Sequence, residues 1–296
     1  MKRLPVVVSA VMVAGVAGAA PAAHAGPVAG VPVSFAATLA GVRDSTAVAV
    51  VTVTADRVVF VLRWNGFVPE YAHLHEGDGD GARRADGHAG KKPPAKVRLF
   101  GSAMPDTVRA AAGQVAINDP GLARRILVNP SGWTVDLHGA QLPGGSMAGR
   151  LTPLRRSIGP LEARKAAGAG AGALRTLASG GQEVPKSDPS KVGDPDGLAL
   201  AELRPDGGTA IAYAYAWFNI QSPSKGHLHK GGPGRNGDVV FDFFNRPVPD
   251  GIFAVSGRLE GLDGAAVKRV QDNPRDYYAN LHTAEFPDGA VRGQLA

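Results

Sequence analysis

The sequence contains no cysteine, and aromatic residues make up only 6% of its 296 residues. Without cysteine the chain cannot form a disulfide, a zinc ribbon or an iron–sulfur cluster, and it has no thiol nucleophile. Any metal ligands must therefore be histidine, aspartate or glutamate. Glycine and proline are abundant by contrast, with 40 and 23 residues. This surplus predicts many turns and argues against a helical bundle.

Long apolar runs are also scarce, and the one at the N-terminus has the layout of a secretory signal peptide. Lys2 and Arg3 precede an apolar run over residues 6–20, and residues 23–25 (AHA) form a small-residue cleavage site. The run is shorter than the roughly 20 residues that a membrane-spanning helix needs. The sequence therefore predicts cleavage near Ala25 and an exported protein, extracellular or associated with the cell envelope, with no transmembrane segment.

The basic excess is modest. Cleavage would remove two cations and lower the formal net charge from +6 to +4. The remaining excess lies in paired residues within stretches rich in glycine, proline and alanine: Arg83-Arg84, Lys91-Lys92, Arg155-Arg156 and Arg164-Lys165. A nucleic-acid surface interleaves such charges with aromatic residues on an ordered face, and this pattern is missing. We expect no nucleic-acid partner. Electrostatic attraction of these basic residues to an anionic polymer of the cell envelope remains an alternative.

The mature chain repeats itself. Aligning His138 with His282, an offset of 144 residues, gives 11 identities over the 33 positions from Asp119 to Leu151. The pair His73 and His75 matches His227 and His229 at an offset of 154, which places an insertion in the first copy at about residues 78–92. We therefore expect domain one at residues 26–151 and domain two at residues 174–296. Residues 152–173 between them have the composition of a flexible linker that would let the domains move independently.

Each copy has the pattern of an antiparallel β protein. Residues 48–55 and 58–64 are β-rich runs separated by a short turn, and residues 197–203 and 210–218 repeat them. One short helix is expected in each copy, beginning after Asp119 and over residues 267–271. The predicted fold is all-β, with two tandem antiparallel sandwich or barrel domains.

Six of the histidines form two equivalent sets: His73, His75 and His138 in domain one, and His227, His229 and His282 in domain two. Alternation along a strand places both members of each H-x-H pair on one face, opposite the leucine between them. The last strand of each copy has its histidine on the same outer face, so neighbouring strands would bring three imidazoles together. Three histidines without a thiolate suit Cu²⁺ or Zn²⁺. His88 and Asp136 are additional candidate ligands. The alternative is that these histidines only form hydrogen bonds that hold loops in place.

Three segments of domain two resemble the CHRD (chordin) domain family, whose pattern runs L-x-G-x-Q-E-V-P, A-H-I-H-x-G and Y-V-N-x-H-T…R-G-Q-L. They are residues 177–185 (LASGGQEVP), 226–231 (GHLHKG) and 278–295 (YANLHTAEFPDGAVRGQL). Domain one is more divergent: it keeps YAHLHEG at residues 71–77, but has GVRD at residues 41–44 and AGRL at residues 148–151. The resemblance implies an immunoglobulin-like β-barrel in an extracellular binding module without established catalysis.

Domain one also resembles Cu/Zn superoxide dismutase, a Greek-key sandwich that uses an H-x-H pair, a bridging histidine and a later histidine. His73, His75, His88 and His138 follow a similar order. The disulfide cysteines of that family are missing, and domain two has no equivalent of His88.

Two functions remain open from the sequence. The first is an exported, non-catalytic module that binds an extracellular protein or an envelope polymer. The alternative is a copper-dependent enzyme similar to superoxide dismutase. Hydrolase motifs such as G-x-S-x-G and H-E-x-x-H are missing. Glu183 belongs to the first family motif, and we interpret it as a loop contact rather than a catalytic acid.

Overall fold

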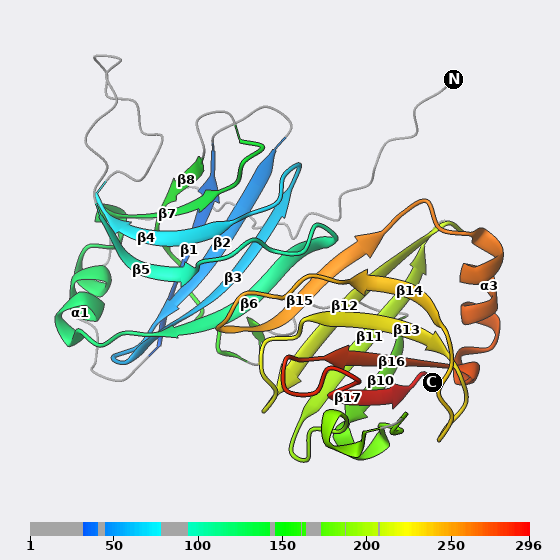
Figure 1. Cartoon of the computed structure of the whole chain (residues 1–296). Coiled ribbons are helices and arrows are strands. Elements are labelled where there is room, and N and C mark those ends of the chain that lie inside the picture. The colour runs from blue at the N-terminus through cyan, green and yellow to red at the C-terminus, as the bar shows by residue number, and fades with distance from the viewer. Residues whose placement is uncertain are drawn as a thin grey trace, which may run out of the picture.

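The computed structural model describes residues 32–40, 45–77, 94–142, 146–160, 162–163, 173–186, 188–206 and 208–296. The predicted signal peptide and the whole insertion at residues 78–92, which includes His88, lie outside these residues. Most of the secondary structure is antiparallel strand, which confirms the all-β sandwich class (Figure 1).

Domain one consists of two sheets that enclose a common core. One sheet has the order β5-β4-β7-β8, and the other runs β9-β1-β2-β3-β6. The strands are β1 (Val33–Leu39), β2 (Thr46–Val53), β3 (Arg57–Asn65), β4 (Tyr71–Glu76), β5 (Ala95–Phe100), β6 (Val108–Ala116), β7 (Trp133–His138), β8 (Ser146–Arg150) and β9 (Thr152–Pro153). Leu74 of β4 and Val135 of β7 are fully buried against Val51 and Phe60 of the opposite sheet's strands.

Domain two repeats strands β1 to β8 of this plan, with β13 in the place of β4 and β16 in the place of β7, whereas β9 has no counterpart among its described residues. Its strands are β10 (Leu174–Ser179), β11 (Leu198–Asp206), β12 (Ala210–Phe218), β13 (Lys225–Lys230), β14 (Val239–Phe244), β15 (Ile252–Leu259), β16 (Tyr277–His282) and β17 (Val291–Gln294). A single pairing, Ser179 with Arg292, continues the sheet from β10 into β17. The order β14-β13-β16-β17 matches β5-β4-β7-β8 of domain one.

Each domain carries one of the two short helices expected from the sequence, α1 (Pro120–Val128) and α3 (Gly264–Asp272). Asp119 caps α1 by accepting a hydrogen bond from the Gly121 amide at 2.8 Å, and Asp263 caps α3 in the same way. Because Asp263 is the cap, α3 starts three residues before the predicted Val267. Neither helix is long and apolar enough to cross a membrane, within the part of the chain that the structure describes.

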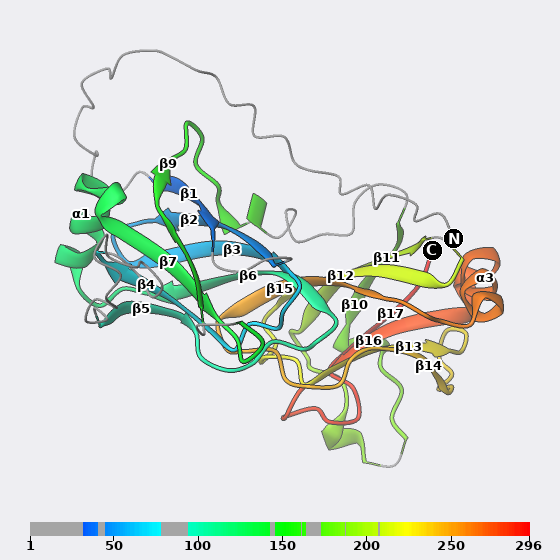
Figure 2. The same cartoon turned by 90° about the horizontal axis from the view of Figure 1, so that it is seen from above.

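The two domains share one sheet, which the composition of the linker does not predict. Strand β6 of domain one pairs with β15 of domain two, and the register places Ala111 opposite Val255 (Figure 2). These two residues are themselves related by the 144-residue offset. The domains therefore meet edge to edge about a local pseudo-twofold axis, and the 13-stranded sheet passes through both.

The first part of the predicted linker is also packed rather than free. Strand β9 pairs with β1, and the Ile158 amide donates a hydrogen bond to Ser34 Oγ at 2.7 Å. Ile158 and the buried Ala163 pack against the outer face of the shared sheet, beside Val59 and Phe253. Residues 152–163 thus help to hold the domains together, whereas the sequence predicts independent motion.

A hydrogen-bonded contact between the domains gives a first testable prediction. Thr107 Oγ1 bonds to the hydroxyl of the buried Tyr213 at 2.8 Å and donates to the Phe243 carbonyl. Thr107→Val should lower the free energy of unfolding by about 1–3 kcal/mol, because it leaves a buried hydroxyl without its partner. Thr107→Val combined with Tyr213→Phe should recover part of this loss. In calorimetry both variants should unfold in one transition, and two separate transitions would contradict a shared sheet.

Candidate metal sites in the two domains

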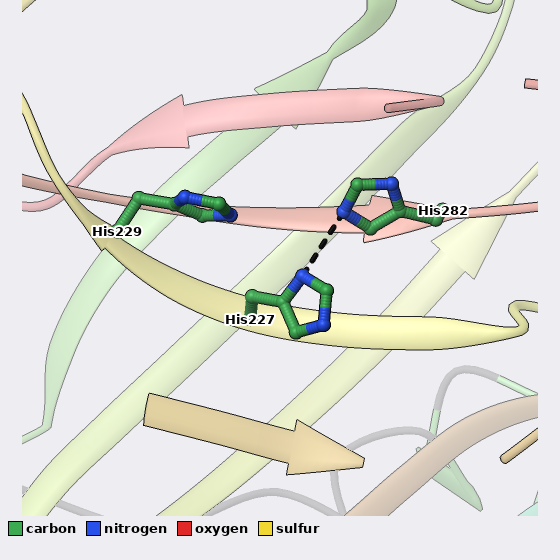
Figure 3. Close-up of side chains that lie close together, drawn as sticks. All are labelled: His227, His229 and His282. Atoms are coloured by element: carbon green, nitrogen blue, oxygen red, sulfur yellow. Dashed lines mark hydrogen bonds between the residues drawn. The ribbon is translucent and has the colours of Figure 1, made fainter. Parts of the chain in front are cut away.

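In domain two, neighbouring strands bring the three predicted histidines together. Strands β13 and β16 pair so that His227 lies opposite Asn280 and Lys225 lies opposite His282. One ring nitrogen from each of His227, His229 and His282 lies within 4.8 Å of the others (Figure 3). Leu228 points to the opposite face and is fully buried, as the strand alternation predicts.

These histidines are buried, although the sequence predicts them on the outer face of the sandwich. Their exposed fractions are 8% for His227, 5% for His229 and 9% for His282. The chain that follows β13 folds back over this face, where the Gly237 carbonyl accepts a hydrogen bond from His229. Asn236 in the same segment donates to the Val184 carbonyl at 2.9 Å. Loop segments therefore cover the site, which a strand pattern alone does not reveal.

The hydrogen bonds at the rim decide which ring nitrogens carry protons. His229 Nδ1 lies 2.9 Å from the Gly237 carbonyl, and His282 Nδ1 lies 2.9 Å from the Pro287 carbonyl. A carbonyl only accepts, so each Nδ1 carries the proton and each Nε2 keeps a free electron pair. His227 Nε2 contacts the Asp242 carboxylate at 3.2 Å, and a proton held there leaves His227 Nδ1 bare.

The three nitrogens that face one another are then all electron-pair donors. His227 Nδ1 and His282 Nε2 are 3.1 Å apart. Two ligands of a tetrahedral Zn²⁺ ion with bonds of 2.0–2.1 Å are separated by about 3.3 Å, so this spacing suits a metal. Burial lowers the pKa of His227 to about 3 and that of His282 to about 4, aided by the neighbouring imidazoles. Burial also lowers the pKa of His229. The cluster is therefore neutral at pH 7.

In domain one, a carboxylate lies at the centre of the corresponding cluster. Asp136 is fully buried, and one of its oxygens lies 3.0 Å from His75 Nε2 and 2.9 Å from His138 Nε2. His73 Nδ1 lies 3.7 Å from the other oxygen. Burial alone would raise the pKa of Asp136, but hydrogen bonds with His138 and His75 hold it well below its usual range. The group with metal-ligand spacing here is His73, Asp136 and His138.

The structure thus places Asp136 among the central residues of domain one, although the sequence indicates it only as an additional candidate ligand. His75 reaches the same carboxylate but is not part of that three-residue group. Burial lowers the pKa of His73. His88, the bridging candidate, lies outside the described residues. The two domains therefore differ in their donors, with imidazoles alone in domain two and imidazoles around a carboxylate in domain one.

A buried arginine supports the site of domain two, and it is not among the candidate site residues predicted from the sequence. Arg292 is 2% exposed, and its guanidinium lies 3.4 Å from the centre of the Tyr278 ring. It donates to the Gly232 and Arg235 carbonyls and to Asn236 Oδ1, so it holds the covering segment in place. The ring of His229 stacks on Tyr278 with 4.8 Å between centroids. Domain one has Ala148 in the place of Arg292. This difference in the repeat alignment could have drawn attention to Arg292.

Comparison with known proteins gives one family match, in domain two. Residues 174–295 match the CHRD domain, which agrees with the resemblance of the three motifs. Domain one lies outside the matched residues, and its relation to domain two consists of the internal repeat and the matching strand order. No curated protein and no solved structure shows a significant match to the chain.

Proposed function

We propose that the protein is an exported, non-catalytic binding module whose domain two holds a Zn²⁺ or Cu²⁺ ion through His227 Nδ1, His229 Nε2 and His282 Nε2. The observation that carries this proposal is the hydrogen bonding at the rim. The two carbonyls and the Asp242 carboxylate hold protons on the outer nitrogens, which leaves the three nitrogens that face one another unprotonated. Such outer partners fix the tautomer of metal-ligating histidines in known sites.

The burial of the ligands favours a structural ion over a catalytic one. Structural sites are closed, whereas catalytic sites keep a position open for water or substrate. An ion bound by His227, His229 and His282 would join β13 to β16 and to the segment that follows β13. It would thereby stiffen the loops at one end of the domain, where a binding module presents its variable segments to a partner.

The partner that we propose is an extracellular protein or an anionic polymer of the cell envelope. The CHRD match and the predicted signal peptide support an extracellular setting. The alternative, a copper enzyme similar to superoxide dismutase, requires His88 in domain one. Within the described residues, no observation favours it over the binding module.

Metal titration tests the proposal. The chain from Gly26, purified without a histidine tag and stripped of metal, should bind Zn²⁺ or Cu²⁺ with a Kd below about 1 μM in calorimetry. His227→Ala and His229→Ala should each weaken the domain-two site by more than about 100-fold, the upper end of the loss caused by removing an outer partner. His138→Ala serves as the matched control, because it alters domain one and should leave the domain-two site intact. A parent chain that binds neither ion would refute the proposal.

A further inference from the structure

Two buried oxygen atoms lack hydrogen-bond partners beside the three histidines of domain two. They are Asn280 Oδ1 and Glu183 Oε1. Asn280 lies on β16, opposite His227 on β13, and is 3% exposed. Glu183 follows the short turn at residues 180–182, and its carboxylate packs so closely over Gly289 that a Cβ there would lie 2.4 Å from Oε1. An unpaired oxygen buried away from water is costly, so two at one place require an explanation.

The orientation of the Asn280 amide links the two unpaired atoms. In the metal-free arrangement Asn280 Nδ2 donates to His282 Nε2 at 3.1 Å, and so occupies the electron pair that a metal would need. Asn280 also interacts with the Glu183 side chain and is among the groups that lower its pKa, although burial dominates and raises that pKa to about 7. The amide group thus lies between the three-histidine cluster and the carboxylate.

A half-turn of this amide would satisfy both oxygens. Its two ends are nearly equal in size, so the turn needs little rearrangement of the packing. After the turn, Oδ1 faces the three imidazole nitrogens and Nδ2 faces the Glu183 carboxylate. The turn also frees His282 Nε2. With a cation held by the histidines, the amide oxygen gains a positive partner and the carboxylate gains a donor.

Domain one provides independent support for an oxygen ligand at this position. The residue 144 positions before Asn280 is Asp136, and it occupies the same place on β7, opposite His73. One of its oxygens lies 2.9 Å from His138 Nε2, and Asp136 belongs to the group with metal-ligand spacing. A carboxylate presents oxygen whichever way it turns, whereas an amide needs a partner that selects its orientation.

We propose that Asn280 Oδ1 is the fourth ligand of the metal in domain two and that Glu183 is the positioning residue that turns the amide toward it. This inference rests on the proposed function, because it requires the three-histidine ion. Three imidazole nitrogens and one oxygen complete a tetrahedral coordination shell. Glu183 acts as an outer partner, which holds the ligand and adds negative charge close to the cation.

The test uses the chain from Gly26 with Zn²⁺ calorimetry and with Co²⁺ as a spectroscopic probe of the ligand set. Asn280→Leu should weaken Zn²⁺ binding by about 100-fold, and Glu183→Gln by about tenfold. Asn280→Asp should bind Zn²⁺ about tenfold more tightly, although the metal-free variant should melt at a lower temperature because two carboxylates then lie together. In the Co²⁺ complex, Asn280→Asp should shift the visible absorption bands. Glu285→Gln, at an exposed side chain in the loop that follows β16, is the matched control and should bind Zn²⁺ as the parent does.

The outcomes separate the two proposals. If the parent chain binds no metal, both the proposed function and this inference fail. If the parent binds Zn²⁺ and His229→Ala abolishes binding, but the Asn280 and Glu183 variants keep the parent's affinity and Co²⁺ spectrum, only the inference fails. Asn280→Asp is a gain of affinity, so a folding defect in Asn280→Leu cannot imitate it.

Discussion

Gly237→Ala is expected to destabilise domain two by about 2–6 kcal/mol and to abolish the tight metal binding proposed for the three histidines. A Cβ at this position would lie 1.5 Å from the Lys230 carbonyl oxygen, which belongs to the backbone and cannot move away as a side chain could. Overpacking alone costs about 1–3 kcal/mol. The displaced segment would also lose the Lys230 amide bond to the Asp238 carbonyl and leave buried polar groups unpaired, which adds about 1–3 kcal/mol.

The metal effect of this substitution follows from the same contact. The Gly237 carbonyl accepts a hydrogen bond from His229 Nδ1, which keeps the proton on Nδ1 and leaves Nε2 unprotonated for a metal. When the segment moves, His229 loses the partner that fixes its tautomer.

Gly232→Ala is a close control for Gly237→Ala. It lies in the same segment, and no atom lies within 4 Å of its added Cβ. Urea unfolding and Zn²⁺ calorimetry on the two variants measure both effects. Equal stability and equal affinity in the two variants would contradict the role assigned to Gly237.

The strands of the β4–β7 and β13–β16 pairs were predictable because local chemistry defines their ends. Strands β7 and β16 begin directly after the Asn-Pro turns at residues 129–130 and 273–274, and they end at the predicted histidines. In β12 every second residue is aromatic or branched, and these residues are all buried: Ile211, Tyr213, Tyr215 and Trp217. The helix cap at Asp119 was likewise visible as a local signal, whereas the cap of α3 at Asp263 was missed and its start was predicted three residues too late.

The strands that join the domains were not predictable from local chemistry. Strand β6 has the sequence VRAAAGQVA, whose alanines favour a helix over a strand when considered alone. Small residues are needed there for tertiary reasons: a Cβ on Gly113 would lie 2.5 Å from the Phe60 ring and 2.7 Å from the Gly251 carbonyl oxygen. The pairing of β6 with β15 therefore depends on contacts between residues far apart in the sequence. The composition of residues 152–173 predicted a flexible linker, and so gave no indication that the domains share a sheet.

The candidate sites were predictable in their ligand types but not in their surroundings. Spacing and alternation placed three histidines together in domain two, and the structure brings them within ligand distance. Their burial depends on the segments after β13 and β16. These segments show no alternation of apolar and polar residues from which their position could be predicted. The repeat alignment paired Asn280 with Asp136, and strand alternation places both on the face of the histidines. Only the structure shows that the Asp136 carboxylate reaches His75 and His138 at 3.0 and 2.9 Å.

Acid is expected to destabilise the metal-free protein from about pH 6.5 downward, through the histidines of domain two. Burial lowers the pKa of His227 to about 3 and of His282 to about 4, from 6.5 in an unfolded chain. Between pH 6.5 and the folded-state pKa values, the unfolded chain binds protons at these histidines and the folded chain does not. Each histidine therefore lowers the free energy of unfolding by about 1.4 kcal/mol per pH unit as the pH falls.

Glu183 acts in the opposite direction over part of this range. Burial raises its pKa from 4.5 to about 7, so between these values the folded chain holds a proton that the unfolded chain releases. Its contribution to stability is fully present below pH 4.5 and is lost as the pH rises through 7. The two histidines outweigh this single carboxyl, and we expect a net loss of about 1.4 kcal/mol per pH unit between pH 6.5 and 4.5.

Two variants separate these opposing contributions in urea unfolding with EDTA at pH 7, 6 and 5. His227→Gln should flatten the pH dependence, because it removes one group that the unfolded chain protonates. Glu183→Gln should steepen it, because the compensating carboxyl is gone while both histidines remain. Each change should amount to about 1–2 kcal/mol between pH 6.5 and pH 5. If the parent and both variants share one pH profile, the buried cluster does not control the acid sensitivity of the fold.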